Sequence, residues 1–163
     1  MTGKQINEMK KLLFLAIMSL ALFSCSKSND DEDKDAYRPE VVEMLKVLEG
    51  KWQGEGGASD EVLTFTPFGK QKWIDGAAGG VMWFHGNATR EFVYIDNTPQ
   101  KWNMYFNVDP KEKKIGMNET TPDGKYSIVT TKEYSYKIID NNTIELHDKS
   151  LSWMHVYKYH RIR

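Results

Sequence analysis

The residues of this chain that could carry out chemistry are one cysteine and four histidines. A thiolate is a nucleophile or a site of modification, and a neutral imidazole is a metal ligand or an acid–base group. His155 and His160 are five residues apart on a predicted strand, so they point to opposite faces and are poor ligands for one metal. His85 and His147 have no sequence neighbour that would complete a ligand set. We interpret all four as surface or satisfied core residues, and we predict no metal site.

Other patterns for catalysis are weak. Adjacent acidic residues such as Asp60 and Glu61 are most simply solvated charges in a turn. The sequence contains no Gly-x-Ser-x-Gly nucleophile elbow and no phosphate-binding glycine loop. We therefore expect that this protein is not an enzyme and that it uses no cofactor.

The single cysteine, Cys25, follows an apolar segment at residues 12–23 that is preceded by lysines. A basic start, a short apolar core and a small residue before the cysteine are typical of an export signal. The core is too short for a membrane-spanning helix, which needs about 20 apolar residues. An exported protein with one cysteine has no partner for an internal disulfide, so another use of Cys25 is expected.

Residues 22–25, Leu-Phe-Ser-Cys, resemble the bacterial lipobox, in which the signal is cut before the cysteine and the sulfur is lipidated. The resemblance implies a signal peptide at residues 1–24 and a lipoprotein anchored to a membrane through an acyl chain, such as palmitate, on Cys25. The acidic segment after it, "CSKSNDDEDKD", resembles the tag that directs some Gram-negative lipoproteins to the outer face of the outer membrane. Residues 25–39 are too polar to bury a core, and we expect a disordered tether at the cell surface.

The remaining residues, 40–163, are long enough for one domain with a single core. The chain has a formal net charge of −1, and the acidic tether accounts for the negative balance of the mature protein. Residues 41–163 are near neutral, which argues against a nucleic-acid surface.

The domain begins with a predicted amphipathic helix. Pro39 suits the first turn, apolar residues recur at Val41, Leu45 and Leu48, and Gly50 can end the helix. From Trp52 onward the pattern changes to short strands. Residues 101–108 alternate most clearly, and one face carries Trp102, Met104, Phe106 and Val108.

Further strands are predicted at residues 125–131, 133–140 and 143–148, for a total of about eight to ten. Residues 140–142, Asp-Asn-Asn, predict a tight hairpin because these residues tolerate positive φ, and residues 121–124 predict a second turn. Evenly spaced strands allow either a sandwich or an up-and-down barrel. Periodicity alone does not choose between them.

A short helix leading into Gly50-Lys51-Trp52, successive hairpins and an aromatic last strand at residues 153–163 resemble the lipocalin-like domains of bacterial lipoproteins. The resemblance implies an all-β fold: one antiparallel up-and-down barrel preceded by a short helix. It also implies that Trp52 closes one end of the barrel and that Arg161 or Arg163 packs over it.

The barrel interior is expected to be either a packed core or a ligand site, since aromatic residues bury about 150–250 Å² each and would not face trapped water. The inward set comprises Trp102, Met104, Phe106, Tyr134 and Tyr136. Trp73 and Trp83 flank the glycine-rich residues 75–80 and could lie on a flap at the barrel mouth, or could simply pack across strands. Residues 81–86, "VMWFHG", are apolar on both faces, which is typical of a strand covered on both sides.

The sequence therefore predicts a lipid-anchored, lipocalin-like module that binds a small apolar or amphipathic ligand through these seven residues. The alternative is a protein-interaction module with a solidly packed barrel and a protein partner. A cavity of a few hundred Å³ would favour the first function, and a filled barrel with an exposed apolar patch the second.

Overall fold

The computed structural model describes residues 36–58, 60–148 and 155–163. The predicted signal peptide, the predicted lipidation site Cys25 and most of the predicted tether lie outside the described residues. Across the described ranges, no helix combines the length and the apolar character needed to cross a bilayer.

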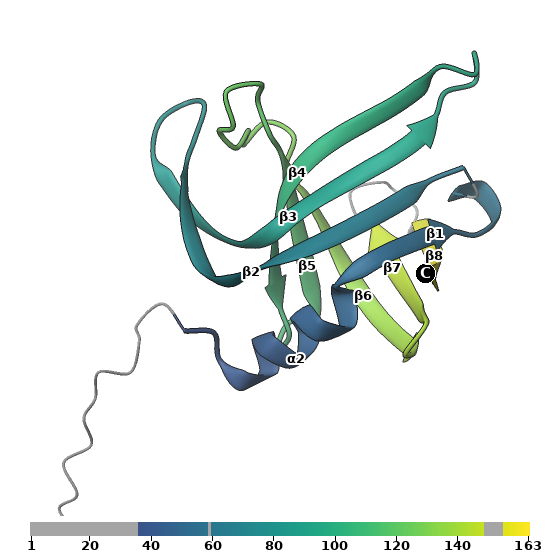
Figure 1. Ribbon diagram of the computed structural model, residues 1–163, viewed down its shortest axis with the longest axis horizontal. Coiled ribbons are helices and arrows are strands. Elements are labelled where there is room, and N and C mark those ends of the chain that lie inside the picture. The colour runs from purple at the N-terminus through teal and green to yellow at the C-terminus, as the bar shows by residue number, and fades with distance from the viewer. Residues whose placement is uncertain (1–35, 59, 149–154) are drawn as a thin grey trace, which may run out of the picture. The chain divides into compact units, whose positions relative to one another are not determined.

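Helix α2, Pro39–Leu48, is the predicted amphipathic helix. It begins with proline, whose fixed φ suits the first turn, and it buries Val41, Met44, Leu45 and Leu48 on one face. Gly50, with a φ of 115°, lets the chain turn from the helix directly into the first strand. Figure 1 shows the helix lying across the lower end of the sheet.

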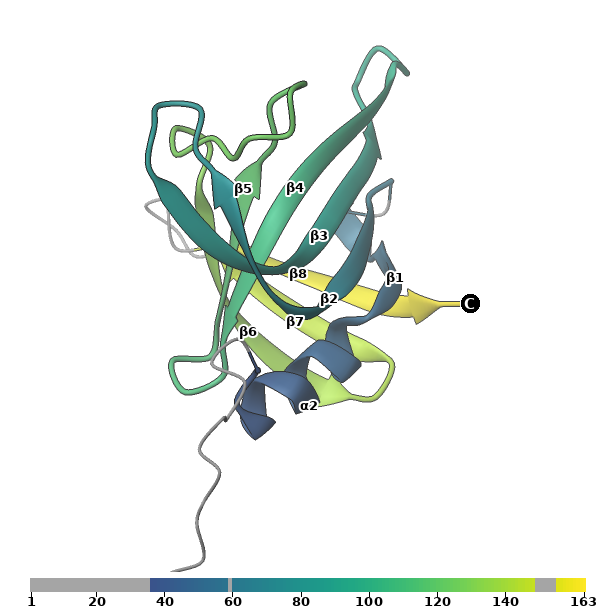
Figure 2. The same cartoon turned by 60° about the vertical axis from the view of Figure 1, so that its left-hand side comes forward.

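Eight antiparallel strands close into one barrel in simple chain order, with the last strand paired to the first (Figures 1 and 2). The predicted all-β, up-and-down barrel is therefore confirmed, with eight strands. The strands are β1 Gly50–Gly54, β2 Val62–Asp75, β3 Val81–Val93, β4 Pro99–Asp109, β5 Lys114–Glu119, β6 Lys132–Asp140, β7 Thr143–Asp148 and β8 His155–Ile162. A short 3₁₀ helix, η1 Gly56–Ala58, follows β1.

The clearest alternating strand lies where the sequence predicted it, within β4. Met104, Phe106 and Val108 are buried and pack with Phe65, Ile115 and the apolar face of α2. Phe65 and Phe106 meet edge to face, with ring centres 5.2 Å apart. The core therefore fills the lower part of the barrel and continues into the helix.

The β2–β3 hairpin is long and bent. The pairing of its strands shifts register between Pro67 and Lys72, and beyond this point the hairpin leaves the barrel wall. Its tip curls upward until Gly76 pairs with Tyr126 of the β5–β6 loop; Figure 2 shows this tip beside that loop. The glycine-rich residues 75–80 thus form a turn with Gly79 and Gly80 at positive φ, tied to Tyr126 by backbone hydrogen bonds.

Two local predictions need correction. Residues 125–131 are not a strand: Ile128 is 55% and Val129 90% exposed, and Tyr126 makes only isolated bridges. The backbone N–H and carbonyl of Tyr126 are hydrogen-bonded to the tip of the β2–β3 hairpin. This segment therefore does not pair with a neighbouring barrel strand as a regular strand would.

The hairpin at residues 140–142 is present, but neither asparagine has positive φ. Instead, the Asp140 carboxylate accepts the Asn142 N–H at 2.7 Å, which closes the turn through a side chain. The turn at residues 121–124 is confirmed, with the Gly124 N–H donating to the Thr121 carbonyl.

Candidate functional site

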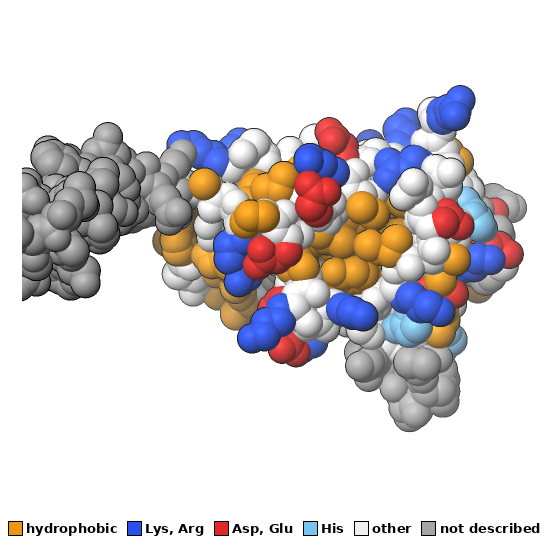
Figure 3. All heavy atoms as spheres, turned by 90° about the horizontal axis from the view of Figure 1, so that it is seen from below, with side chains coloured by type: hydrophobic (Ala, Val, Ile, Leu, Met, Phe, Trp, Pro, Cys, Tyr) orange, Lys and Arg blue, Asp and Glu red, His pale blue; other side chains and the backbone are white. Residues whose placement is uncertain are grey.

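The lower end of the barrel is closed by a contact between the two residues that the lipocalin resemblance implied. Trp52 is fully buried, and its Nε1–H donates to the Leu48 carbonyl at 2.7 Å. The Arg161 guanidinium lies 4.4 Å from the Trp52 ring centre. It also donates to the carbonyls of Val47 and Glu49, where the last turn of α2 has no internal partners. Figure 3 shows this end as a closed surface, with hydrophobic side chains in its centre and charged ones around them.

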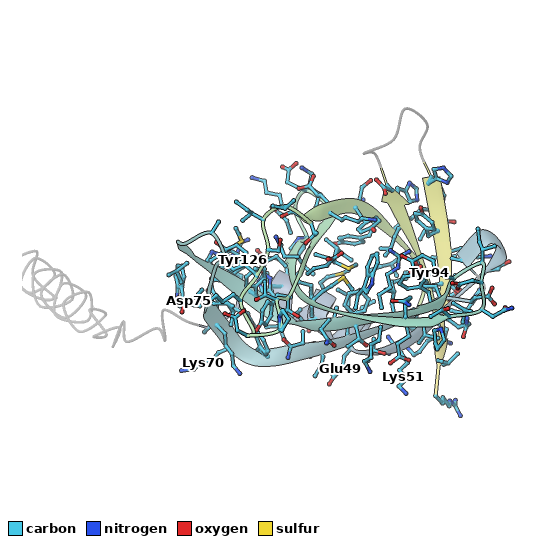
Figure 4. The ribbon with its side chains drawn as sticks, turned by 90° about the horizontal axis from the view of Figure 1, so that it is seen from above. Glu49, Lys51, Lys70, Asp75, Tyr94 and Tyr126 are labelled. Atoms are coloured by element: carbon cyan, nitrogen blue, oxygen red, sulfur yellow. The ribbon has the colours of Figure 1, made fainter. Side chains whose placement is uncertain are left out.

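The upper part of the interior holds a small pocket, which we call the mouth pocket. Its volume is about 20 Å³ for the centre of a water molecule, enough for roughly one water. It is lined by Leu63, Trp102, Met104, Met117, Glu119, Thr130, Lys132, Tyr134 and Leu146, and by the polar group of Glu61, Arg90 and Tyr159. Seen from above, side chains fill the middle of the ring of strands (Figure 4). Among the described residues, the mouth pocket is therefore much smaller than the few hundred Å³ expected of a hollow barrel.

A charged network forms one part of the lining of the mouth pocket. Glu61 is only 6% exposed, and one of its carboxylate oxygens lies 2.5 Å from Nη2 of Arg90. The other oxygen accepts the Tyr159 hydroxyl at 2.5 Å. The interpretation of Glu61 as a solvated turn charge was therefore wrong, although Asp60 beside it is exposed. The sequence separations of 29 and 98 residues hide this network from any local pattern.

Two polar atoms around the pocket have no hydrogen-bond partner within the described part of the chain. They are Nε of Arg90 and Oγ1 of Thr130, and both are buried. Buried donors without partners cost about 1–3 kcal/mol each, so they suit a site that a water or a ligand completes. Arg90 thus offers an unused N–H to the pocket it lines.

Burial and neighbouring charges shift the pKa values of Tyr134, Tyr159 and Arg90, which line the mouth pocket. Burial raises the pKa of Tyr134 to about 12. Burial, together with the negative charge and hydrogen bond of Glu61, raises the pKa of Tyr159 still further. Burial disfavours the charge on Arg90, but the Glu61 hydrogen bond and charge outweigh it and raise the pKa of the guanidinium. Neither tyrosine nor Arg90 is poised to exchange protons near neutral pH, so the arrangement suits binding more than acid–base chemistry.

Aromatic rings surround the upper opening. Trp102 meets Phe92 edge to face at 4.9 Å, and Phe92 meets Tyr94 at 5.2 Å. The Arg90 guanidinium lies 5.5 Å from the Trp102 ring centre. The residues on the predicted inward face of this strand therefore have two different positions. Met104 and Phe106 are buried in the core, whereas Trp102 is half-buried and lines the mouth pocket.

The structure does not bring the seven predicted ligand residues into one site. Trp73 and Trp83 pair across the bent part of the β2–β3 hairpin, outside the barrel, where Trp73 is 62% exposed. Tyr134 lines the mouth pocket, and Tyr136 is half-buried against the core. Trp73 and Trp83 therefore show the cross-strand packing that was the alternative to a flap, and neither lines the mouth pocket.

Among the described residues, no group of three or more histidine, cysteine, aspartate or glutamate side chains is placed to hold a metal ion. His147 and His160 each lie beside a glutamate, Glu145 and Glu55 respectively. His85 is buried, and its Nδ1 accepts the Val108 N–H at 3.0 Å.

Comparison with protein-family models, with curated proteins and with solved structures gives no match to this chain. The candidate site therefore rests on its own geometry.

Proposed function

We propose that this protein is a lipid-anchored binding module that takes a small amphipathic ligand at the open upper end of its barrel. The observation that carries the proposal is the network of Glu61, Arg90 and Tyr159 beside Trp102. The ligand places a hydrogen-bond acceptor on the Arg90 guanidinium and its apolar part against the rings of Trp102 and Phe92.

Energetics support a binding role for this network. Taking an ion pair out of water costs several kcal/mol per ion, and well-packed apolar residues of the same volume are often at least as stable. A small barrel that needed only a core would gain little from Glu61 and Arg90. Arg90 also keeps one N–H without a partner among the described residues, which a bound acceptor would satisfy.

The size of the mouth pocket limits how the ligand sits. Since the space inside is about 20 Å³, the ligand lies mainly above Trp102, between the β3–β4 hairpin and residues 128–130, and only its polar group reaches Arg90. The ligand is thus held at the mouth of the barrel and not in a deep hollow.

The anchor is part of the same proposal. Lipidation of Cys25 at the outer membrane would hold the domain at the cell surface on its acidic tether. Replacing Cys25 by alanine is expected to abolish the membrane-bound form, as measured by detergent partitioning of cell fractions. If the variant partitions with membranes as fully as the wild type does, the anchor is not Cys25.

A dye titration tests the mouth pocket. Anilinonaphthalene sulfonate is amphipathic and carries an acceptor group, so the wild-type protein is expected to bind it. Trp102→Ala is expected to weaken binding by about tenfold or more, which corresponds to about 1.4 kcal/mol. The matched control is Trp73→Ala, which removes an exposed tryptophan outside the barrel and should change binding by less than about twofold. Equal losses in both variants would argue against a site at the mouth.

A protein-interaction module is the second candidate. Its supporting observation is that the core is packed from Phe106 down to α2, while Tyr94, Ile95 and Val129 on the upper loops are strongly exposed. Exposed apolar clusters of this kind mark partner surfaces. Failure of the wild-type protein to bind the dye would favour this function.

A further inference from the structure

A second hollow lies on the outside of the barrel and shares no residue with the mouth pocket. We call it the outer hollow. It has a volume of about 570 Å³ for water centres, within the range of about 300–1,000 Å³ typical of small-molecule sites. It forms where residues 36–41, the start of β3 and the outer faces of β4, β5 and β6 meet. The bend of the β2–β3 hairpin creates it, because β3 stops pairing with β4 at Gly86.

Three aromatic rings form one wall of the outer hollow. Tyr37 and Trp83 both pack on His85, with ring centres 5.0 Å and 4.8 Å apart, and the Tyr37 hydroxyl donates to the His85 carbonyl. Tyr37 falls within the predicted tether, but it is partly buried here because its ring has apolar area to cover. His85 Nδ1 accepts the Val108 N–H, so the neutral ring carries its proton on Nε2 as a donor.

Amide side chains supply the polar part of the lining. The Asn107 Nδ2 group donates to the Trp83 carbonyl at 3.0 Å, while its Oδ1 is buried without a hydrogen-bond partner of normal geometry in the described chain. Gln71 adds a second amide and Asn118 a third, but the Asn118 Nδ2 group already donates to two oxygen atoms of the chain. An entirely apolar ligand would leave the Gln71 amide and Asn107 Oδ1 desolvated, at a cost of about 1–3 kcal/mol each.

Both positive charges of the outer hollow's lining are paired. Lys114 pairs with Glu133 at 3.0 Å, and Arg38 lies 3.4 Å from Glu40, which is not part of the lining. Asp109 and Glu112 are the remaining charged residues of the lining, and both are negative. The hollow therefore offers no concentrated positive charge for a phosphate or a polyanion.

The floor of the outer hollow is opened by Gly116, in the middle of β5. A Cβ placed on this glycine would meet no atom within 4 Å, and its φ lies outside the positive region. Neither packing nor backbone geometry therefore requires glycine, which weakens a strand by roughly 0.5–1 kcal/mol relative to alanine. Glycine in a strand interior often marks close approach of a ligand to the backbone.

From these features we infer that the outer hollow binds a neutral saccharide. The C–H face of a sugar ring packs on aromatic rings such as Trp83 and Tyr37, and its hydroxyls exchange hydrogen bonds with the side-chain amides of Asn107 and Gln71. A sugar offers C–H groups to the aromatic rings and hydroxyls to the side-chain amides of this lining. A lipid chain would contact only the rings, and an anion would find no unpaired positive charge. This site is independent of the ligand proposed at the barrel mouth.

Glycan binding by the full chain, purified in detergent, tests this inference. The probes are an array of neutral oligosaccharides, including chito-, manno-, cello- and maltohexaose, with sulfated and uronic-acid glycans for comparison. The wild-type chain is expected to bind at least one neutral oligosaccharide. Gly116→Val, which places a branched side chain on the open floor, is expected to reduce that binding by about tenfold or more.

Gly69→Val is the matched control. Gly69 also lies in a strand, also has open space around its missing Cβ and also avoids positive φ, but it is not part of the outer hollow. It should bind the glycan within about twofold of the wild type, and thermal melts should show both variants folded. The inference is overturned if no neutral glycan binds the wild type, if only acidic glycans bind, or if Gly116→Val binds as well as Gly69→Val. Loss of dye binding in Trp102→Ala with glycan binding intact would show that the two sites are separate.

Discussion

Replacement of Arg90 by methionine is expected to lower the free energy of unfolding by about 3 kcal/mol, the low end of the range for breaking a buried ion pair. Methionine keeps much of the apolar stem but leaves the carboxylate of Glu61 buried with only the Tyr159 hydroxyl as a partner. The low end applies because the Arg90 side chain retains 23% exposure, so water offsets part of the lost interaction. Urea denaturation of the purified protein measures the effect.

A double-mutant cycle separates the pair from its surroundings. Glu61→Gln in the Arg90→Met background removes the stranded charge while still accepting the Tyr159 hydroxyl. This double variant is expected to recover to within about 1 kcal/mol of the wild type. A loss below about 1 kcal/mol for Arg90→Met alone would mean that the pair behaves like an exposed one, and the case for a built site at the mouth would fail.

Acidification is expected to destabilise the protein through His85, by about 3 kcal/mol between pH 7 and pH 4. Burial, helped by the nearby positive charge of Arg38 and opposed by the Asn107 amide, lowers the pKa of His85 to about 4. The unfolded chain binds this proton near pH 6.5, whereas the native state does not bind it until about pH 4. Native stability from this residue is therefore complete above pH 6.5 and is lost progressively as the pH falls toward 4.

The comparison with His85→Gln isolates this effect from the other titrating groups. Glutamine can still accept the Val108 N–H but does not ionise, and the remaining histidines and carboxylates are common to both proteins. The difference in unfolding free energy between the two proteins should therefore change with pH by about 3 kcal/mol across this window. Parallel pH profiles from denaturant melts would contradict the buried, neutral state of His85.

The helix and the strands were predictable because their signals are local, whereas the closure of the strands into a barrel was implied by the family resemblance. The alternation of residues 101–108 and the helical spacing of Val41, Leu45 and Leu48 report burial within a few residues of chain. The contact of Arg161 with Trp52 had a different source, since it came from a family resemblance and not from any periodicity. Both kinds of signal concern the fold and not the candidate site.

The polar part of the mouth pocket could not be predicted in this way. Glu61 stands beside Asp60 in a sequence that looks like a turn, and only the pairing of β2 with β3, which sets Leu63 opposite Arg90, brings Glu61 close to Arg90. The outer hollow was hidden for a similar reason. The shift between Pro67 and Lys72 moves Trp73 and Trp83 off the barrel wall, and residues 125–131 have strand-like composition although their backbone pairs with the hairpin tip.

The pairing of β1 with β8 has a consequence for how the chain reaches this structure. Arg161 and Glu49, which meet at the seam, are 112 residues apart in sequence. Contacts between residues this far apart in sequence form slowly. The chain must lose the conformational entropy of closing a long loop before the contact contributes any stability. During synthesis the edge of β1 stays unpaired until the last residues emerge, so the nascent chain remains open to translocation machinery and to chaperones. A truncation before β8 would leave the edges of β1 and β7 without a partner strand. Such a chain should aggregate instead of forming a smaller barrel.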